Sequence, residues 1–522
     1  MESPLSWQPE LDQLAKLSAL AREHGGAEKV ARHKAAGKLT ARERIDGLLD
    51  GGSFHEIGGI AGSARYDPSE VEVTGFTPAN LVIGRGAVEQ RPVVVAADDF
   101  TVRGGANDGA VKEKLTYVEA MANELCLPLI RLVDGTGGGG SVKNIENEGA
   151  THVPNNGGRL WDLVCRNLST IPVVGLALGS TAGLGAARVC SSHYSMMVRG
   201  TAQLFAAGPP LVARVGQVVT KEELGGSEIH ARNGVVDDEV ESEGEAFLRT
   251  RRFLSYLPPS VHEFPPRATP IVDTARSDEW LLAAIPRDDR KVYKIRPIVE
   301  TLFDTGSFME IGRLWGKSIV TGFARLDGWA VAVMASDPYV YGGAWSADTA
   351  QKIVRFVDLA ETFHLPVVFL VDIPGFAIGV DSERAGTIRH GVRALAAIHQ
   401  ARVPWCSVIL RKAFGIAGAA HMNGGRFNFR YAWPSGQWGS LPLAGGLEVA
   451  YKSEIESAPD PVAKLCEIQE RLARLRSPIR SAERFFIEEI IDPRQTRSVL
   501  CEFAALAAPL RVAGTPSFGT RP

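Results

Sequence analysis

Little in this 522-residue sequence points to a metal site, a membrane or a nucleic acid. It has six cysteines, and no two of them have the two-to-four-residue spacing of a zinc site, so we expect buried, reduced thiols. The formal net charge of −3 lacks the basic excess that nucleic acid or an anionic membrane requires. The first residues, MESPLSWQPE, have no basic segment before an apolar core, so we expect no signal peptide and take the cytosol as the default location.

One uncharged stretch, from Ile171 to Ala187, approaches the length of a membrane span. It is slightly short for that role, and glycines together with Ser180 and Thr181 interrupt it. We therefore favour a buried strand that enters a glycine-rich turn.

Motifs for side-chain catalysis are also missing. The sequence has no GxSxG nucleophile elbow, no HExxH pair and no EF-hand loop. The run GTGGGG, residues 135–140, is not followed by Lys-Ser/Thr in P-loop register, and no GxGxxG opens a helix after the first strand. This run is either a glycine-rich loop with no binding role or a loop whose backbone binds phosphate. His421, close to a later glycine turn, is the one histidine we consider for proton transfer.

What the sequence does contain is a long internal repeat. The phrase RLVDGTG at residues 131–137 returns as FLVDIPG at residues 369–375. A constant offset of 238 positions also relates the flanking segments, RPVVVAADDFTVRGGA (91–106) and WAVAVMASDPYVYGGA (329–344). Further downstream, AGLGAA (182–187) answers FGIAGAA (414–420), where Gly183 pairs with Gly415. We infer an internal duplication.

Each half has apolar strands that alternate with helices and glycine turns. Near-continuous Val/Ile/Leu strands of this kind predict α/β units with largely parallel strands covered on both faces. The length also exceeds what a single core supports. A proline-rich segment at 256–273 interrupts regular structure, so we predict domains over residues 1–265 and 266–522. Within the first domain, residues 1–60 are expected to form a helical arm.

The two later glycine turns each follow a buried strand and begin a run of small residues. Such a turn can point two successive backbone N–H groups at one oxygen, which makes an oxyanion hole. The alternative is tight helix packing without catalysis. Two such holes, with no nucleophile in evidence, suggest enolate formation beside a second carbonyl-like group.

At these residues the chain resembles the carboxyltransferase β-subunits of biotin-dependent acyl-CoA carboxylases, such as propionyl-CoA and methylcrotonyl-CoA carboxylase. The resemblance covers nearly the whole chain and is carried by the phrases TARERIDGLLDGGSFHEIG, DDFTVRGG, EELGGSEIH, VDIPGF, IRHGVRALAAI, YAWP and IIDPRQTR. It implies two tandem crotonase-like ββα-spiral domains. It also implies transfer of a carboxyl group between carboxybiotin and the α- or vinylogous carbon of an acyl-CoA.

The resemblance also implies which residues form the site. Gly183 and Leu184 correspond to the first oxyanion hole, which holds the thioester enolate, and Ile416 and Ala417 to the second, which holds the ureido oxygen of biotin. The ureido anion itself would act as the base, and no metal is expected. The implied substrate-binding residues are Gly137, Gly138, Gly185, Gly415, Gly418 and Ala419. For the phosphates of coenzyme A, the candidates are Arg103, Lys112 and Arg188.

Biotin is expected on a partner, because no methionine of this chain flanks a lysine as around a biotinylated lysine. The implied partners are a biotin carboxylase and a biotin carboxyl carrier, and the implied assembly is a homo-oligomer, at least a dimer and in this family a hexamer. Relatives usually have GPCAGGA and YGGAYDVM where this chain has GSTAGLGA and FGIAGAAHM, and Ala419 replaces an acidic residue. We therefore expect an acyl group bulkier or less polar than propionyl.

Three alternatives stay open on the sequence alone. The first is the reverse reaction, by a biotin-dependent decarboxylase or transcarboxylase. The second is a biotin-independent hydrolase, decarboxylase or isomerase of CoA esters on the same fold, and the third is a non-enzymatic scaffold.

Overall fold

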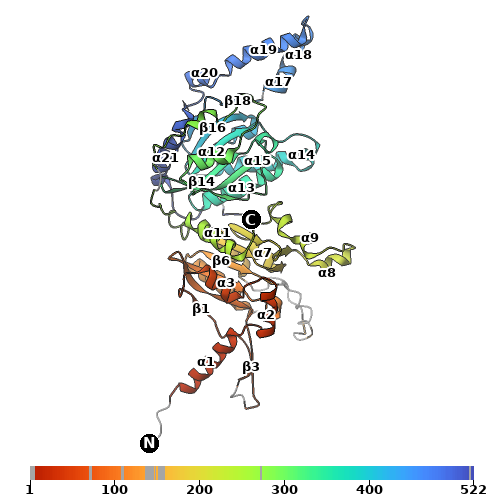
Figure 1. Cartoon of the computed structure of the whole chain (residues 1–522), viewed down its shortest axis with the longest axis vertical. Coiled ribbons are helices and arrows are strands. Elements are labelled where there is room, and N and C mark those ends of the chain that lie inside the picture. The colour runs from red at the N-terminus through yellow and green to blue at the C-terminus, as the bar shows by residue number, and fades with distance from the viewer. Residues whose placement is uncertain are drawn as a thin grey trace. The chain divides into compact units, whose positions relative to one another are not determined.

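The chain forms two compact units, described here from a computed structural model (Figure 1). Unit 1 comprises residues 1–262 with 519–522, and unit 2 comprises residues 263–518, so the division falls inside the proline-rich segment. The structure describes residues 6–69, 73–106, 111–135, 146, 149–150, 159–270, 273–441, 443–516 and 519–521.

Unit 1 begins with three helices, α1 (Gln8–Arg22), α2 (Ala27–Ala35) and α3 (Ala41–Leu48). A capping box starts α3, since Thr40 accepts from the N–H of Glu43 and the Glu43 carboxylate accepts from the N–H of Thr40. The predicted helical arm over residues 1–60 is therefore helical only as far as Leu48. Beyond it the chain forms β1 (His55–Ile57), which pairs with the main sheet.

The main sheet of unit 1 has the strand order β1-β4-β5-β6-β7-β9-β11. Pairing is antiparallel from β1 to β5 and parallel from β5 to β11. Its further strands are β4 (Leu81–Val88), β5 (Arg91–Asp98), β6 (Leu129–Val133), β7 (Val173–Ala177), β9 (Tyr194–Val198) and β11 (Asp238–Val240). Strands β5, β6 and β7 are almost entirely buried, as expected for parallel strands covered on both faces.

The main sheet of unit 2 repeats this arrangement with the order β12-β13-β14-β15-β16-β17-β19. Here too the first three strands are antiparallel and the rest are parallel. Its strands are β12 (Met309–Ile311), β13 (Ile319–Leu326), β14 (Trp329–Ser336), β15 (Val367–Ile373), β16 (Trp405–Phe414), β17 (Phe429–Ala432) and β19 (Glu489–Ile490), with β18 (Gln437–Gly439) paired to β16. The predicted duplication and the α/β fold class are confirmed.

The two units also agree in individual backbone angles and ion pairs. Arg103 and Tyr341 have φ values of 52° and 51°, and both lie in left-handed turns that few non-glycine residues adopt. Arg42 pairs with Glu56 in unit 1 as Arg296 pairs with Glu310 in unit 2. The two units therefore agree in local detail as well as in strand order.

Helices and short elements complete both units. In unit 1 they are β2 (Gly62–Tyr66), β3 (Val73–Pro78), η1 (Arg103–Gly105), α4 (Lys112–Glu124), α6 (Leu160–Asn167), β8 (Ser180–Ala182), α7 (Leu184–Cys190), β10 (Gln203–Phe205), α8 (Pro209–Val212), η3 (Ala213–Val215), α9 (Lys221–Gly225), α10 (Ser227–His230) and α11 (Glu243–Ser255). In unit 2 they are η4 (Glu279–Ala283), α12 (Ile295–Leu302), η5 (Tyr341–Gly343), α13 (Ala347–Thr362), α14 (Val380–Arg384), α15 (Thr387–Gln400), α16 (Gly415–Ala419), α17 (Leu443–Ala450), α18 (Lys452–Glu456), α19 (Pro461–Leu475), α20 (Pro478–Glu483), η6 (Pro493–Gln495), α21 (Thr496–Ala507) and η7 (Ala508–Leu510). Figure 1 shows α17 to α20 extending away from the sheet of unit 2.

Two absences concern the described part of the chain. None of its helices combines the length and apolar character needed to cross a bilayer. Its His, Cys, Asp and Glu side chains form no group of three or more that could hold a metal ion.

Candidate functional site

The first predicted glycine turn joins β8 to α7. Gly183 has φ 60° and ψ −122°, a backbone conformation that glycine tolerates best, and α7 begins at the next residue, Leu184. The Gly183 N–H donates to the carbonyl of Phe205 on β10 at 3.2 Å, so in this conformation it is already bonded within the fold. The Leu184 N–H belongs to the first turn of α7, where N–H groups have no acceptor inside the helix. Of the two predicted donors, Leu184 is thus the better placed.

Close backbone packing supports this turn. The carbonyl of Gly135 accepts from the N–H of Ala182 at 3.3 Å, and a Cβ atom on Gly105 would lie 2.5 Å from the carbonyl oxygen of Asp134. Gly185 is buried, and a Cβ atom there would lie 2.7 Å from Thr181 Cγ2. Small residues are therefore required here by packing within the fold. The predicted Gly137 and Gly138 lie outside the described residues.

A buried carboxylate sits under the same turn. Asp134, at the carboxyl end of β6, lies 3.1 Å from Lys38 Nζ and 3.0 Å from Arg44 Nη2. Arg44 also pairs with Glu243. A Cβ atom on Gly179 would lie 1.9 Å from Asp134 Oδ1, so only glycine leaves room for this ion pair. The network ties the N-terminal helices to the chain just before the turn.

A cationic cavity of about 350 Å³ opens beside η1 in unit 1. Its lining residues are Lys29, Arg32, His33, Ala36, Lys38, Phe100, Thr101, Arg103 and Gly104. None of these described lining residues is acidic, and burial lowers the pKa of His33. Lys38 Nζ lies 4.6 Å from the centre of the Phe100 ring, so one cation already packs on an aromatic face. The cavity therefore favours an anion.

The three predicted phosphate contacts are placed differently. Arg103 lines the cationic cavity, whereas the side chain of Lys112 lies outside the described part of the chain. Arg188 is only 3% exposed, and its Nη1 lies 3.0 Å from Asp98 Oδ1. The phosphate contact of Arg188 stays a prediction, and the buried ion pair with Asp98 does not favour it.

The second predicted turn joins β16 to α16. Gly415 has φ 63°, close to the value at Gly183, and Ile416 is 53% exposed while Ala417 is buried. A Cβ atom on Gly418 would lie 2.5 Å from the carbonyl carbon of Ala413, so the small residues after the turn are again required by packing.

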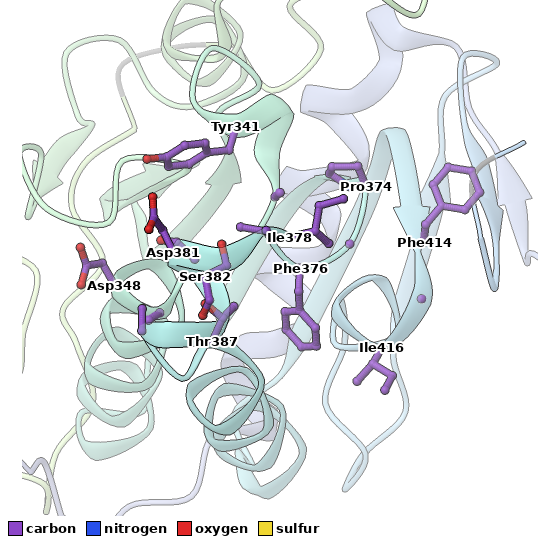
Figure 2. A pocket seen from close by; sticks show the side chains of 18 of the residues that line it. Tyr341, Asp348, Pro374, Phe376, Ile378, Asp381, Ser382, Thr387, Phe414 and Ile416 are labelled. Atoms are coloured by element: carbon purple, nitrogen blue, oxygen red, sulfur yellow. The ribbon is translucent and has the colours of Figure 1, made fainter. Parts of the chain in front are cut away.

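Gly415 and Ile416 open onto a cavity of about 1010 Å³ in unit 2. Figure 2 shows Phe376 and Ile378 in its wall, with Phe414 and Ile416 on one side and Tyr341, Asp348 and Asp381 on the other. The residues that line it are Tyr341, Ala344, Ser346, Ala347, Asp348, Pro374, Gly375, Phe376, Ala377, Ile378, Gly379, Val380, Asp381, Ser382, Ala385, Thr387, Phe414, Gly415, Ile416, Ser440 and Leu441. Its surface is mainly apolar, with carboxylates at one end.

A buried carboxylate also lies under this turn. Asp372 is bonded by Arg411 Nε at 3.0 Å, by the Tyr293 hydroxyl at 3.0 Å and by the N–H of Lys412 at 3.1 Å. Burial raises the pKa of Asp372, and Arg411 is the main group that opposes this rise.

The remaining predicted residues lie on the other side of α16. Gly418, Ala419 and His421 line a second cavity of about 200 Å³, which also touches Gly415. His421 is buried, and burial lowers the pKa of its imidazole. The structure thus brings Gly415 to both cavities, but Ile416 and Ala419 to different ones.

Two groups of lining residues were missed by sequence reasoning. The cations of α2, Lys29 and Arg32, were assigned to an arm, although the basic density of EKVARHKAAGK was a usable signal. Phe376 and Ile378 follow the repeated Asp-glycine turn, where the pattern marked a loop but gave no side-chain direction.

Known proteins match this chain over almost its full length. Residues 32–515 match the family described as the carboxyl transferase domain. The carboxyltransferase subunit of propionyl-CoA carboxylase from Haloferax mediterranei is 33% identical, with 95% of each chain covered. The alpha subunit of methylmalonyl-CoA decarboxylase from Veillonella parvula is 30% identical, covering 96% of this chain and 95% of that protein. Among solved structures, transcarboxylase 12S, a hexamer described with methylmalonyl-coenzyme A bound, has a TM-score of 0.87 at 28% identity over 100% of this chain and 99% of that one.

Proposed function

Because the chain belongs to the carboxyl transferase domain family, we propose that it moves a carboxyl group between carboxybiotin on a partner protein and the α- or vinylogous carbon of an acyl-CoA. The observation that carries the proposal is the pair of glycine turns at equivalent positions of the two units. One lies beside a cationic cavity and the other opens onto a large apolar cavity. Both turns follow the carboxyl ends of parallel strands, where α/β folds bind their ligands.

The first turn stabilises the enolate of the thioester. An α-proton of a thioester leaves only if the negative charge that develops on the thioester oxygen is stabilised. The Leu184 N–H is the leading donor. Gly183 provides the left-handed turn that presents it, and the Gly183 N–H becomes a second donor only if it leaves the Phe205 carbonyl.

The second turn holds biotin. The N–H groups of Ile416 and Ala417 receive the ureido oxygen, and the apolar wall around Phe376 and Ile378 suits the rest of the ring system. The charge left on the ureido group after the carboxyl group departs makes it the base for the α-proton. No side-chain nucleophile is then needed.

The cationic cavity receives the phosphates of coenzyme A. Lys29, Arg32 and Arg103 provide charged donors of the kind that bind phosphate oxygens. A series of backbone contacts connects the cavity with the first turn: Gly104 lines the cavity, and Gly105 packs against Gly135, which accepts from Ala182. One extended ligand can therefore place its phosphates and its thioester in unit 1.

The implied partners are a biotin carboxylase and a biotin carboxyl carrier. A homo-oligomer is proposed for this chain too, and a hexamer is the expected form because transcarboxylase 12S assembles as one. Light scattering of the purified chain tests the assembly: a monomer with full activity would contradict it.

Reconstitution tests the reaction. The purified chain is combined with a biotin carboxylase, its biotinylated carrier, ATP, bicarbonate and a panel of acyl-CoAs. Turnover is expected with all components and none without the carrier or after avidin is added. Turnover of a CoA ester by the chain alone, persisting with avidin, would instead establish the biotin-independent alternative.

A second candidate is the reverse direction. The relative from Veillonella parvula is named as a decarboxylase subunit, and the same turns stabilise the same enolate in both directions. Incubation of the chain with carboxylated acyl-CoAs and free biotin tests it. Loss of the carboxyl group that depends on biotin would support this direction.

A further inference from the structure

A further cavity of unit 2 combines cations with an apolar wall, and the proposed carboxyl transfer gives it no role. Its volume is about 800 Å³, which is within the range of pockets that hold small molecules. Among the described residues that line it, five are cationic and one is acidic. These charged residues are Arg287, Asp289, Arg290, Arg411, Lys412 and Arg476. The balance of charge favours an anionic ligand.

Arg476, directly after α19, is the cation whose surroundings point most clearly to a ligand. Its Nη2 atom is buried and has no hydrogen-bond partner in the described part of the chain. The guanidinium carbon lies 5.1 Å from the centre of the Phe414 ring, so one face of the group packs on an aromatic side chain. Burial lowers the pKa of Arg476, and the charge of Asp289 opposes this only in part. A buried donor without an acceptor is costly, so the position suits a ligand that brings an acceptor.

Two of the other cations already have an anionic partner within the fold. Arg411 pairs with Asp372 at 3.0 Å, and both side chains are buried. Arg290 pairs with Asp288 at 3.1 Å. These two cations therefore add little net charge to the cavity.

The remaining charges leave a positive surplus. Lys412 Nζ, which carries three hydrogens, donates to the backbone carbonyl of Asp289 at 3.5 Å. Each carboxylate oxygen of Asp289 accepts from Gln437 Nε2 at 3.1 Å. Arg287, Lys412 and Arg476 thus provide three positive charges against the one negative charge of Asp289, a surplus of two. A ligand with two negative charges would balance it.

The uncharged part of the lining is mainly apolar. It includes Leu282, Ile285, Trp433 and Pro478, and these side chains offer an organic group a surface to pack on. A bare inorganic anion would leave this surface unused. The ligand that fits the whole cavity is therefore charged at one end and apolar at the other.

We propose that this cavity binds a small molecule that carries two negative charges at one end, as a phosphate monoester or a dicarboxylate does, and an apolar group at the other. Arg476 Nη2 and Lys412 Nζ donate to the anionic oxygens, and such charge-assisted hydrogen bonds are the strong ones. The apolar group packs on the wall around Ile285. The inference does not rest on the proposed function, because the site uses neither the N–H groups of the glycine turns nor the cationic cavity of unit 1.

Calorimetric titration of the full-length chain tests the inference with two probes of similar shape, phenyl phosphate and phenylmalonate. The titration is run at about pH 8, where a phosphate monoester is a dianion. We expect at least one probe to bind at least about 10-fold more tightly than sulfate, which lacks the apolar group, and than benzyl alcohol, which lacks the charge. Arg476→Gln should weaken that binding about 10-fold, through the loss of a charge-assisted hydrogen bond. Arg471→Gln is the matched control, since Arg471 lies on α19 and packs on the Tyr451 ring outside the cavity lining; its affinity should equal that of the unmodified chain.

Each outcome decides the inference. Tighter binding of phenyl phosphate alone identifies the ligand class as a phosphate monoester, and tighter binding of phenylmalonate alone identifies a dicarboxylate. Affinities no greater than those for sulfate and benzyl alcohol, or equal in the unmodified chain and Arg476→Gln, overturn the inference. If Arg476→Gln does not fold, Lys412→Met takes its place, because it removes the ammonium group but keeps the N–H that bonds Asp372.

One result would assign the probes to another site. Binding that survives Arg476→Gln but disappears in the double variant Lys29→Ala, Arg32→Ala would place them in the cationic cavity of unit 1, and the inference would fall. Carboxyl transfer is measured separately by reconstitution, so a failure here leaves the proposed function untouched.

Discussion

Both units have a buried carboxylate under a glycine turn, but the cations that neutralise it come from different elements. In unit 2, Arg411 on β16 neutralises Asp372 from the neighbouring strand. In unit 1, the position equivalent to Arg411 is Gly179, and the cations come instead from Lys38 and Arg44 in the N-terminal helical segment. The two units therefore share a backbone arrangement, whereas the cations that pair with the buried carboxylate come from different elements.

This difference changes what each unit offers a ligand. Lys38 and residues of α2 line the cationic cavity of unit 1, whereas the large cavity of unit 2 is mainly apolar. The turn residues follow the same division: Arg103 and Tyr341 share a left-handed φ but carry a charged and an aromatic side chain. The equivalent turns of the two units therefore present side chains of different chemistry on a shared backbone conformation.

Removal of one backbone donor should have the greatest effect on activity. Leu184 is the first residue of α7, where proline fits a helix but has no N–H. Leu184→Pro should lower kcat by about 10²–10³, the usual cost of one oxyanion donor, whereas Leu184→Ala keeps the N–H and should be far milder. Steady-state kinetics in the reconstituted system measure this, with circular dichroism to confirm folding. Equal activity of the two variants would show that Leu184 is not a donor.

The next largest effect concerns the buried carboxylates. Asp372→Asn leaves Arg411 buried without its charged partner, which should lower the free energy of unfolding by about 3 kcal/mol. Asp134→Asn should cost less, because Arg44 keeps its pair with Glu243. Urea unfolding of both variants measures the difference. A larger loss for Asp134→Asn would mean that the two networks are not related as described.

The cationic cavity should matter to binding rather than to the chemical step. The double variant Lys29→Ala, Arg32→Ala should raise KM for an acyl-CoA about 10-fold through lost phosphate contacts, with kcat nearly unchanged. A thioester truncated before the nucleotide should show no such change. Lys34→Ala is the matched control, since Lys34 lies on the same helix but pairs with Glu43. A rise in KM equal for the control and the double variant would argue against the phosphate site.

The smallest expected effect is the loss at low pH of the stability that the capping box of α3 contributes. The equivalent helices α3 and α12 differ, because α3 has a capping box, whereas Lys294, the N-cap residue of α12, makes no side-chain cap. Hydrogen bonds from Lys34 and Thr40 lower the pKa of Glu43 from 4.5 to about 2. This contribution is therefore complete above pH 4.5 and is lost as the pH falls toward 2. Glu43→Gln should destabilise slightly at pH 7, and the difference from the unmodified chain should vanish near pH 2; a constant difference would contradict the assignment.

Much of the fold was predictable because the repeat is local and periodic. Offsets between blocks such as Asp134 and Asp372 fixed equivalent strands, and the topologies agree. The contacts that distinguish the units could not be predicted. Lys38 and Asp134 are 96 positions apart in the sequence, and a contact at that separation produces no recognisable spacing pattern. The bond from Gly183 to Phe205 was missed for the same reason: a turn motif shows that an N–H can be presented, but not whether another strand already accepts it.

The path of an isotopic label from the carrier to the CoA ester shows whether this chain transfers the carboxyl group of carboxybiotin. Carrier protein is first charged with labelled bicarbonate, freed of ATP and then mixed with the chain and an acyl-CoA. We predict that the unmodified chain moves the label from carboxybiotin to the acyl-CoA, whereas with Leu184→Pro the label stays on the carrier. Label that stays on the carrier with the unmodified chain and every acyl-CoA tried, or that transfers equally well with Leu184→Pro, would contradict the account.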